Sequence, residues 1–105
     1  MSKDVLGELA KVISERRESA ADKSYTKQLL DGGPEKCAKK FGEEAVEFVI
    51  ACVAEDEAAL KGVAADVLYH LLVALEARDV SVDDVLEVLG GRMGLSGLEE
   101  KAQRD

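Results

Sequence analysis

Apolar residues recur along most of the chain at helical spacing, and no strand-like alternation of useful length occurs. The first stripe predicts an amphipathic helix from Lys3 to about Ser19, followed by a loop. Its apolar positions are Val5, Leu6, Leu9, Val12 and Ile13. Ser24 then suits the start of a short helix or turn, which Asp31-Gly32-Gly33 stops.

The middle of the chain predicts two long helices. Pro34 fits the first turn of a helix that runs to about Val53 or Ala54, because its missing N–H is not needed there. Asp56 is a suitable N-cap for a second helix from about Glu57 to Ala77. The core stripe expected for this second helix is Leu60, Ala64, Val67, Leu68, Leu71, Leu72 and Leu75. A connection this short makes the two helices antiparallel neighbours.

The last predicted helix is short. Ser81 and Asp84 have the Ser-x-x-acid spacing of a helix start, and Gly90-Gly91 should end the helix. The tail from Arg92 to Asp105 has room for one more helical turn. These elements predict one all-α domain over residues 1–105, an antiparallel helical hairpin with flanking helices.

Composition and charge narrow the class of protein. The chain has 105 residues, and aromatics make up only 4%, which suits helices packed through Val, Leu and Ala. A domain this small buries a limited core, so we expect a helical-bundle homodimer. The net charge of −8 argues against nucleic acid and anionic membranes as partners. No signal pattern or membrane-length apolar run is evident, so we expect a cytoplasmic protein without a membrane partner. The two cysteines, Cys37 and Cys52, are interpreted as small buried apolar residues.

The first long helix carries a strongly charged stretch. Lys40, Glu44 and Glu47 fall at i, i+4 and i+7, on one helix face. Much of the remaining surface is apolar, so we expect this helix to be buried on most sides. The apolar positions include Val46, Val49, Ile50 and Val53. Carboxylates on such a helix need a partner, because an unpaired buried charge costs several kcal/mol.

The second long helix can supply that partner. Asp66 shares a face with position 63, and antiparallel packing can bring Asp66 to Glu44 and Glu47. Carboxylates from facing helices are a known way to hold a divalent metal. All-oxygen ligands favour Mg²⁺, with Mn²⁺ as a close substitute, and a Mg²⁺ site suits chemistry on a phosphate anhydride.

Simpler interpretations also fit these residues. Acids at i, i+3 are common on solvated helix faces, so Glu44 and Glu47 could instead pair with Lys40 and Lys39. His70 is more often a hydrogen-bonded structural histidine than a catalytic base.

Three separated blocks resemble the phosphoribosyl-ATP pyrophosphohydrolases of histidine biosynthesis. They are residues 24–37, 40–47 and 64–72, and the tail at 94–101 is similar as well. The ordered set is specific, although each block alone is not. This family belongs to the MazG-like all-α nucleotide pyrophosphatases. Their signature is E-x-x-E on one helix and E-x-x-D on the next, binding Mg²⁺.

The resemblance implies Mg²⁺-dependent hydrolysis of 1-(5-phosphoribosyl)-ATP to 1-(5-phosphoribosyl)-AMP and pyrophosphate, the second step of histidine biosynthesis. Carried over by position, the implied metal ligands are Glu44, Glu47 and Asp66. Glu43 is a further acid that could orient the attacking water. The implied substrate contacts are Lys40, Lys36, Lys39, Tyr25 and Lys27.

One position departs from the family's signature. The first acid of E-x-x-D should stand at 63, where this chain has Val63, which cannot ligate metal. Two alternatives therefore stay open beside the family's activity. They are a related pyrophosphatase for other nucleoside triphosphates, and a helical dimer in which Val63 impairs catalysis.

Overall fold

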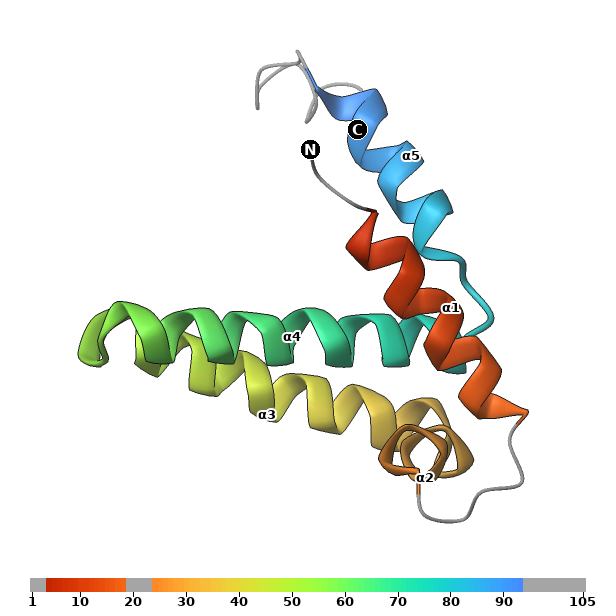
Figure 1. Ribbon diagram of the computed structural model, residues 1–105, viewed down its shortest axis with the longest axis horizontal. Coiled ribbons are helices and arrows are strands. Elements are labelled where there is room, and N and C mark those ends of the chain that lie inside the picture. The colour runs from red at the N-terminus through yellow and green to blue at the C-terminus, as the bar shows by residue number, and fades with distance from the viewer. Residues whose placement is uncertain (1–3, 19–23, 94–105) are drawn as a thin grey trace.

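The computed structural model describes residues 4–18 and 24–93, and these ranges form five α-helices and no strand. Figure 1 shows their arrangement around two long helices that lie side by side. The helices are α1 (Val5–Arg17), α2 (Tyr25–Asp31), α3 (Gly33–Ala54), α4 (Glu57–Ala77) and α5 (Val82–Arg92). The all-α fold with an antiparallel hairpin is confirmed. The predicted tail helix and the family-like block at 94–101 lie outside the described residues.

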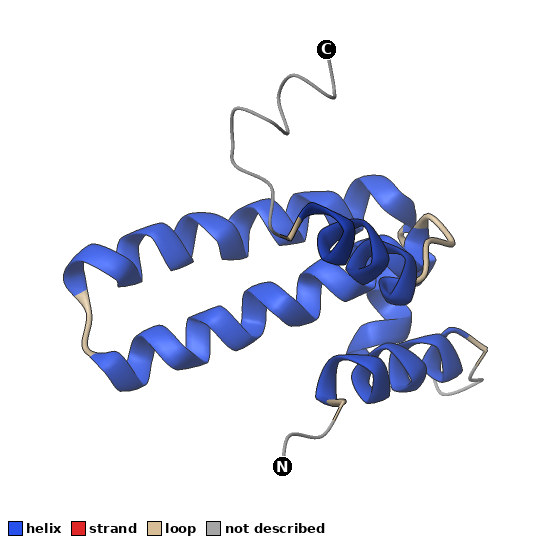
Figure 2. Cartoon of the chain, turned by 90° about the horizontal axis from the view of Figure 1, so that it is seen from above, coloured by secondary structure: helices blue, strands red, loops and turns tan. Residues whose placement is uncertain are grey.

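The α3–α4 hairpin begins and ends where local chemistry dictates. Gly33 has φ of +83°, a left-handed conformation that favours glycine, and Pro34 follows in the first turn of α3. At the other end, the Asp56 side chain accepts a hydrogen bond from the Ala59 N–H at 2.9 Å and caps α4. The predicted bounds of α4 are confirmed, and α3 begins one residue earlier than expected. Figure 2 shows the two helices side by side from above as well.

The core sits at one end of this hairpin, where α1 and α2 pack on it. Its buried members come from four helices, and Val73 of α4 has 0% exposure. They are Ile13, Leu29, Cys37, Leu72 and Val73. The Cys37 thiol also donates to the Leu29 carbonyl at 3.1 Å, which joins α3 to α2. The N-cap role predicted for Ser24 is confirmed, since its hydroxyl accepts from the Lys27 N–H.

Polar contacts fix α1 across the end of α4. The Arg17 guanidinium donates at 3.0 Å to both the Glu76 carbonyl and its carboxylate, and at 2.6 Å to Asp79. The Glu76 carbonyl also accepts from the Asp79 N–H at 2.9 Å, so Arg17 is a second donor to this carbonyl at the end of α4. These bonds raise the pKa of Arg17, first through Glu76 and then through Asp79.

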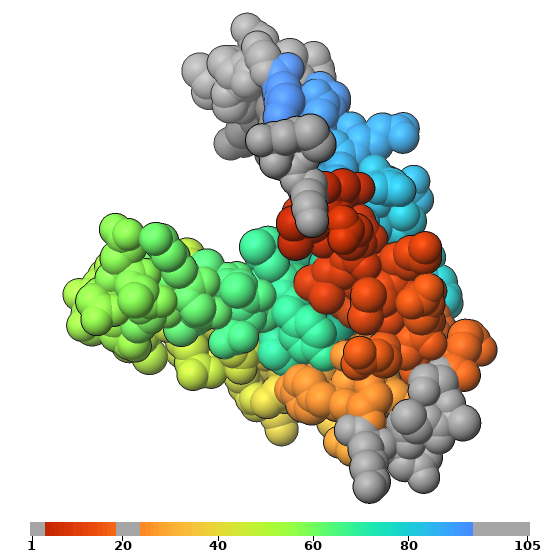
Figure 3. Space-filling view, viewed as in Figure 1, coloured from red at the N-terminus to blue at the C-terminus, as the bar shows by residue number. Residues whose placement is uncertain are grey.

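The expectation that α3 is buried on most sides is wrong for the single chain. Val46, Val49, Ile50 and Val53 are all exposed, Val53 to 85%. The interpretation of Cys52 as buried is wrong too, whereas Cys37 is buried as expected. The reason is that α4 covers only one side of α3. Of the shorter helices, α2 packs on α3 near its beginning. Figure 3 shows the far end of the hairpin projecting beyond the rest of the described chain.

Two further expectations need correction. The helix that begins after Ser81 does not end at Gly90-Gly91 but continues to Arg92, with neither glycine in a positive-φ conformation. Among the described residues, one helix is long and apolar enough to cross a membrane by length and composition, namely α4. A core helix of a soluble protein meets the same criteria. The strongly apolar α4 packs along α3 as the second arm of the hairpin.

Candidate functional site

Glu44 and Glu47 of α3 and Asp66 of α4, which we call the acidic face, lie where the two helices run alongside each other. The pKa of Glu44 is raised above its ordinary value, first because its surroundings desolvate it and then because Glu47 repels its charge. Asp66 of α4 adds to the repulsion, while His70 opposes it. Glu47 on the same helix and Asp66 on the facing helix therefore both lie within electrostatic range of Glu44.

Lysine pairing on this face differs from the simpler interpretation. Lys40 pairs with Glu43 at 3.2 Å, one turn along α3. Across residues 4–18 and 24–93, no ion pair joins Glu44 or Glu47 to a lysine. The pKa of Lys40 is raised, first by its hydrogen bond to Glu43 and then by Tyr25, with a smaller effect of Glu44. Lys40 is therefore paired with Glu43 and lies within electrostatic range of both Tyr25 and Glu44.

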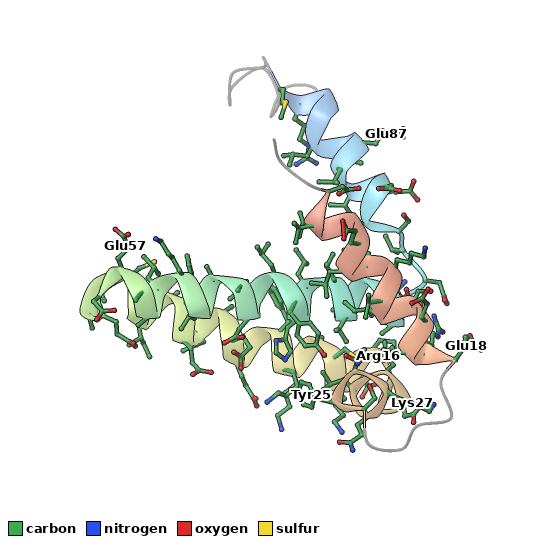
Figure 4. All side chains as sticks on the ribbon, in the orientation of Figure 1. Arg16, Glu18, Tyr25, Lys27, Glu57 and Glu87 are labelled. Carbon is green, nitrogen blue, oxygen red and sulfur yellow. The ribbon has the colours of Figure 1, made fainter. Side chains whose placement is uncertain are left out.

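The other predicted substrate contacts are less closely gathered. Lys36 and Lys39 are exposed on the same helix as Lys40. Lys27 pairs with Asp31 within α2 at 3.2 Å. In Figure 4, Tyr25 and Lys27 lie on opposite sides of α2, as a two-residue separation on a helix requires. Tyr25 thus lies within electrostatic range of Lys40, whereas Lys27 is paired with Asp31.

A polar and aromatic cluster, which we call the α2–α4 network, borders the acidic face. Its members are Tyr25, Thr26, Tyr69 and His70. Tyr25 bonds to His70 Nε2 at 3.2 Å, and Thr26 bonds to Tyr69 at 2.5 Å. His70 is buried, and its Nδ1 lies 2.8 Å from the Asp66 carbonyl oxygen. A hydrogen-bonded His70 was predicted, but no local signal links it to Tyr25, which is 45 residues away in sequence.

The donor chemistry of the acidic face fits a hard divalent cation. Glu44, Glu47 and Asp66 offer carboxylate oxygens, the ligands that Mg²⁺ prefers. The raised pKa of Glu44, caused first by desolvation and then by repulsion from Glu47 and Asp66, reflects an unfavourable charge that a bound cation would stabilise. In the part of the chain that the structure describes, no three His, Cys, Asp or Glu side chains are already arranged to hold a metal ion. Val63, half-buried one turn before Asp66, adds no ligand.

Fold and site together define a small all-α protein with an acidic face between two antiparallel helices, the architecture expected of all-α nucleotide pyrophosphatases. The family model for phosphoribosyl-ATP pyrophosphohydrolase matches residues 6–92. The chain belongs to this family.

Curated relatives agree with the family match over almost their whole length. The phosphoribosyl-ATP pyrophosphatase of a Ruegeria species is 56% identical over 100 residues, covering 95% of each chain. Phosphoribosyl-ATP pyrophosphatase 1 of Rhodopseudomonas palustris is 52% identical over 104 residues, covering 99% of this chain and 97% of its own. The phosphoribosyl-ATP pyrophosphatase of Cereibacter sphaeroides is 55% identical over 100 residues, covering 95% of this chain and 97% of its own.

Proposed function

We propose that the acidic face of α3 and α4 hydrolyses 1-(5-phosphoribosyl)-ATP to 1-(5-phosphoribosyl)-AMP and pyrophosphate, as the second step of histidine biosynthesis. Family membership supports the reaction. The observation that supports the placement is the raised pKa of Glu44, caused first by desolvation and then by Glu47 on the same helix, with a further contribution from Asp66 on α4. Such a biosynthetic enzyme is expected to work in the cytoplasm.

The residues divide into three proposed roles. Glu44, Glu47 and Asp66 would hold Mg²⁺, or Mn²⁺ in its place. A bound cation would neutralise phosphate charge and stabilise the pyrophosphate leaving group. Lys40 would contact phosphate oxygens as a point charge, with Lys36 and Lys39 as further contacts on the exposed side of α3. Glu43, which pairs with Lys40, would orient the lysine or the attacking water.

The experiment measures pyrophosphate release from phosphoribosyl-ATP with and without Mg²⁺, for the parent chain and Glu47→Gln. Turnover that needs both Mg²⁺ and Glu47 supports the proposal, and a loss of roughly a hundredfold or more is expected for a ligand residue. Equal turnover of Glu47→Gln would contradict its role. A preference for ordinary deoxynucleoside triphosphates would favour a related pyrophosphatase instead.

Val63 motivates a second arm of this experiment. It stands one turn before Asp66, where the family's signature has an acid, so Val63→Glu should add a ligand and tighten Mg²⁺ binding. Isothermal titration measures the affinity directly. A folded parent chain without turnover that gains activity as Val63→Glu would identify the parent as a catalytically impaired helical protein. Equal or weaker Mg²⁺ affinity in Val63→Glu would mean that position 63 does not face the cation.

We also propose that the exposed apolar side of the hairpin forms a homodimer. Val46, Val49, Ile50 and Val53 of α3 form an apolar surface, and Leu68 of α4 is also exposed. A hollow of about 240 Å³ between the helices is lined by Phe48, Ala64, Val67 and Leu68. Apolar surface of this kind on a small domain is typical of an interface with a second copy.

Two exposed valines make a matched test of the dimer. Val49 and Val5 are each 63% exposed, but Val49 belongs to the proposed interface on α3 and Val5 to α1. Val49→Glu should convert the dimer to a monomer, because it buries an unpaired charge at the interface. Val5→Glu should leave the dimer intact. Light scattering after gel filtration gives the mass, and a monomeric parent chain would overturn the proposal.

A further inference from the structure

Tyr25 is the aromatic side chain that a ligand can reach from solvent. The chain has two tyrosines, two phenylalanines and no tryptophan, and all four aromatic residues lie within the described range 24–93. Tyr25 is 48% exposed, whereas the other three are half-buried. These three are Phe41, Phe48 and Tyr69. Tyr25 therefore offers the open aromatic surface of this part of the chain.

The Tyr25 ring is fixed by neighbours from α4. It stacks with Tyr69 at a centroid distance of 6.3 Å and an angle of 20° between the ring planes. Its hydroxyl lies 3.2 Å from Nε2 of His70, and the two rings meet edge to face at 6.1 Å. A ring that is already oriented loses little conformational entropy when a ligand packs on its open part.

The same contacts place the ring beside the acidic face. Nδ1 of His70 lies 2.8 Å from the Asp66 carbonyl oxygen, so a single imidazole ring connects Asp66 to the Tyr25 hydroxyl. Along α4, Asp66, Tyr69 and His70 stand at i, i+3 and i+4, which puts them on one helix face within about 5.4 Å of rise. The aromatic rings therefore begin one helical turn from a carboxylate of the acidic face.

The hydrogen bonds leave the ring of Tyr25, and not its hydroxyl, for a ligand. A carbonyl oxygen can only accept, so Nδ1 of His70 donates to Asp66, and Nε2 of the neutral imidazole is an acceptor. The Tyr25 phenol then donates its proton to Nε2. With this proton directed at His70, the hydroxyl has none to offer a phosphate oxygen, and the exposed surface that remains is the flat ring.

We infer that Tyr25 forms the base subsite of this enzyme: its ring stacks on the adenine of phosphoribosyl-ATP while the phosphates bind at the acidic face. The inference rests on the proposed function, which places the phosphates at Glu44, Glu47 and Asp66. In a nucleotide, one ribose separates the base from the α-phosphorus, so a base-binding surface has to lie close to the phosphate site. The Tyr25 ring is the exposed aromatic surface that meets this condition.

The stack can be tested without turnover, because the chain has only two tyrosines. In NMR spectra of the full-length protein, labelled with ¹⁵N and with ¹³C in its tyrosine rings, the Tyr25 signals are those that Tyr25→Phe removes. Phosphoribosyl-AMP with Mg²⁺ should move them upfield through the ring current of the stacked purine, and ribose 5-phosphate with Mg²⁺ should not. Unchanged Tyr25 signals, together with shifted backbone signals of Glu44 and Glu47, would overturn the inference and leave the proposed function standing.

Two substitutions separate the ring of Tyr25 from its hydroxyl. Tyr25→Leu removes the stacking surface and should raise KM for phosphoribosyl-ATP roughly tenfold. Its kcat should stay within about twofold, because the base stacks equally in the ground state and the transition state. Tyr25→Phe keeps the ring and loses the hydrogen bond to His70, so it should raise KM by less than about threefold. Equal KM values in the two variants would overturn the inference, because the hydroxyl would then make the contact.

Thr26→Val is the matched structural control. It removes the neighbouring hydrogen bond between α2 and α4, which joins Thr26 to Tyr69, and leaves the Tyr25 side chain as it is. It should lower Tm and leave KM unchanged. If Tyr25→Leu and Thr26→Val raise KM in proportion to their loss of Tm, Tyr25 only supports the fold and the inference fails. A parent chain without turnover would contradict the proposed function, and the base subsite with it.

Discussion

The two ends of the α3–α4 hairpin differ in whether other helices cover them. Where α2 joins α3, the hairpin is covered by α1 and α2, and Leu29, Cys37 and Val73 are almost completely buried. Toward the Glu55-Asp56 connection, nothing in the described chain covers the outer side of α3, and Val49 and Val53 face solvent. The difference does not follow from hydrophobicity, since valines and leucines occur at both ends. It follows from which neighbours the short helices can reach.

The acidic face occupies the stretch between these two ends. On the side toward α2, the acidic face borders the α2–α4 network, where hydrogen bonds fix the orientation of the side chains. Its other limit is the exposed apolar surface that we assign to a second copy. A charged site needs both rigid support and access for a substrate. The covered end supplies the support, and the open side of the hairpin supplies the access.

The largest expected contrast comes from truncating one apolar residue at each end. Leu29 is 2% exposed, so Leu29→Ala should lower the free energy of unfolding by about 3 kcal/mol through a cavity in the core. Val53→Ala, at the opposite end, should change the free energy of unfolding of the monomer by less than about 0.5 kcal/mol, because Val53 is 85% exposed in the single chain. Urea unfolding measures both substitutions in the Val49→Glu background, which is expected to be monomeric. Comparable losses there would show that the far end is as tightly packed within one chain as the core.

The sequence predicted the covered end and the hairpin well, because those features are local. Asp56 and Ser24 act as N-caps as expected, and the bounds of α4 match the prediction. Helical spacing also brought Glu44 and Glu47 onto one face. The sequence could not predict which side of α3 is buried. A helix that is apolar on several sides carries no pattern that indicates which side its neighbours occupy.

Contacts between distant segments were beyond prediction for the same reason. Nothing local to Tyr25 indicates that it meets His70, and their hydrogen bond exists only because α2 packs against α4. Val63 was visible as a departure from the family's signature. Its consequence depends on the geometry of Asp66 one turn later, which a sequence pattern does not supply.

The reactivity of the two cysteines measures the difference between the two ends of the hairpin without any substitution in the core. Cys37 lies in the covered end, where burial raises the pKa of its thiol, and Cys52 lies exposed on the outer part of α3. A thiolate-directed disulfide reagent should therefore modify Cys52 at least about tenfold faster than Cys37. Mass spectrometry of the labelled peptides distinguishes the two sites. Equal rates would mean that the covered end opens as readily as the exposed one.

Protein concentration sharpens the cysteine experiment. If the apolar side of α3 is the dimer interface, Cys52 should become slower to react as the concentration rises, while Cys37 should not change. The Val49→Glu variant provides the control, because its Cys52 should react at one rate at all concentrations. A Cys52 rate in the parent chain that ignores concentration would argue against an interface on this side.

The smallest expected effect lies in the acidic face between the two ends. Desolvation, and then repulsion from Glu47, raise the pKa of Glu44 above the ordinary 4.5, so the folded chain binds this proton more tightly than the unfolded chain. The free energy of unfolding therefore falls as pH rises from about 4.5 through the raised pKa. Glu44→Gln removes that penalty and should raise Tm at neutral pH by about 2 °C. The gain should vanish below pH about 4.5, where Glu44 is protonated in both states.

Glu43→Gln is the control for this change, since it sits next to Glu44 but loses an ion pair with Lys40 instead of a repulsion. It should not raise Tm. Added Mg²⁺ then separates repulsion from ligation: the parent chain should gain stability from the cation, and Glu44→Gln should gain less. If Glu44→Gln is less stable than the parent chain at neutral pH without metal, Glu44 is held by a favourable partner. The Glu44 carboxylate would then stabilise the fold by itself, and a cation would not be needed to offset repulsion on the acidic face.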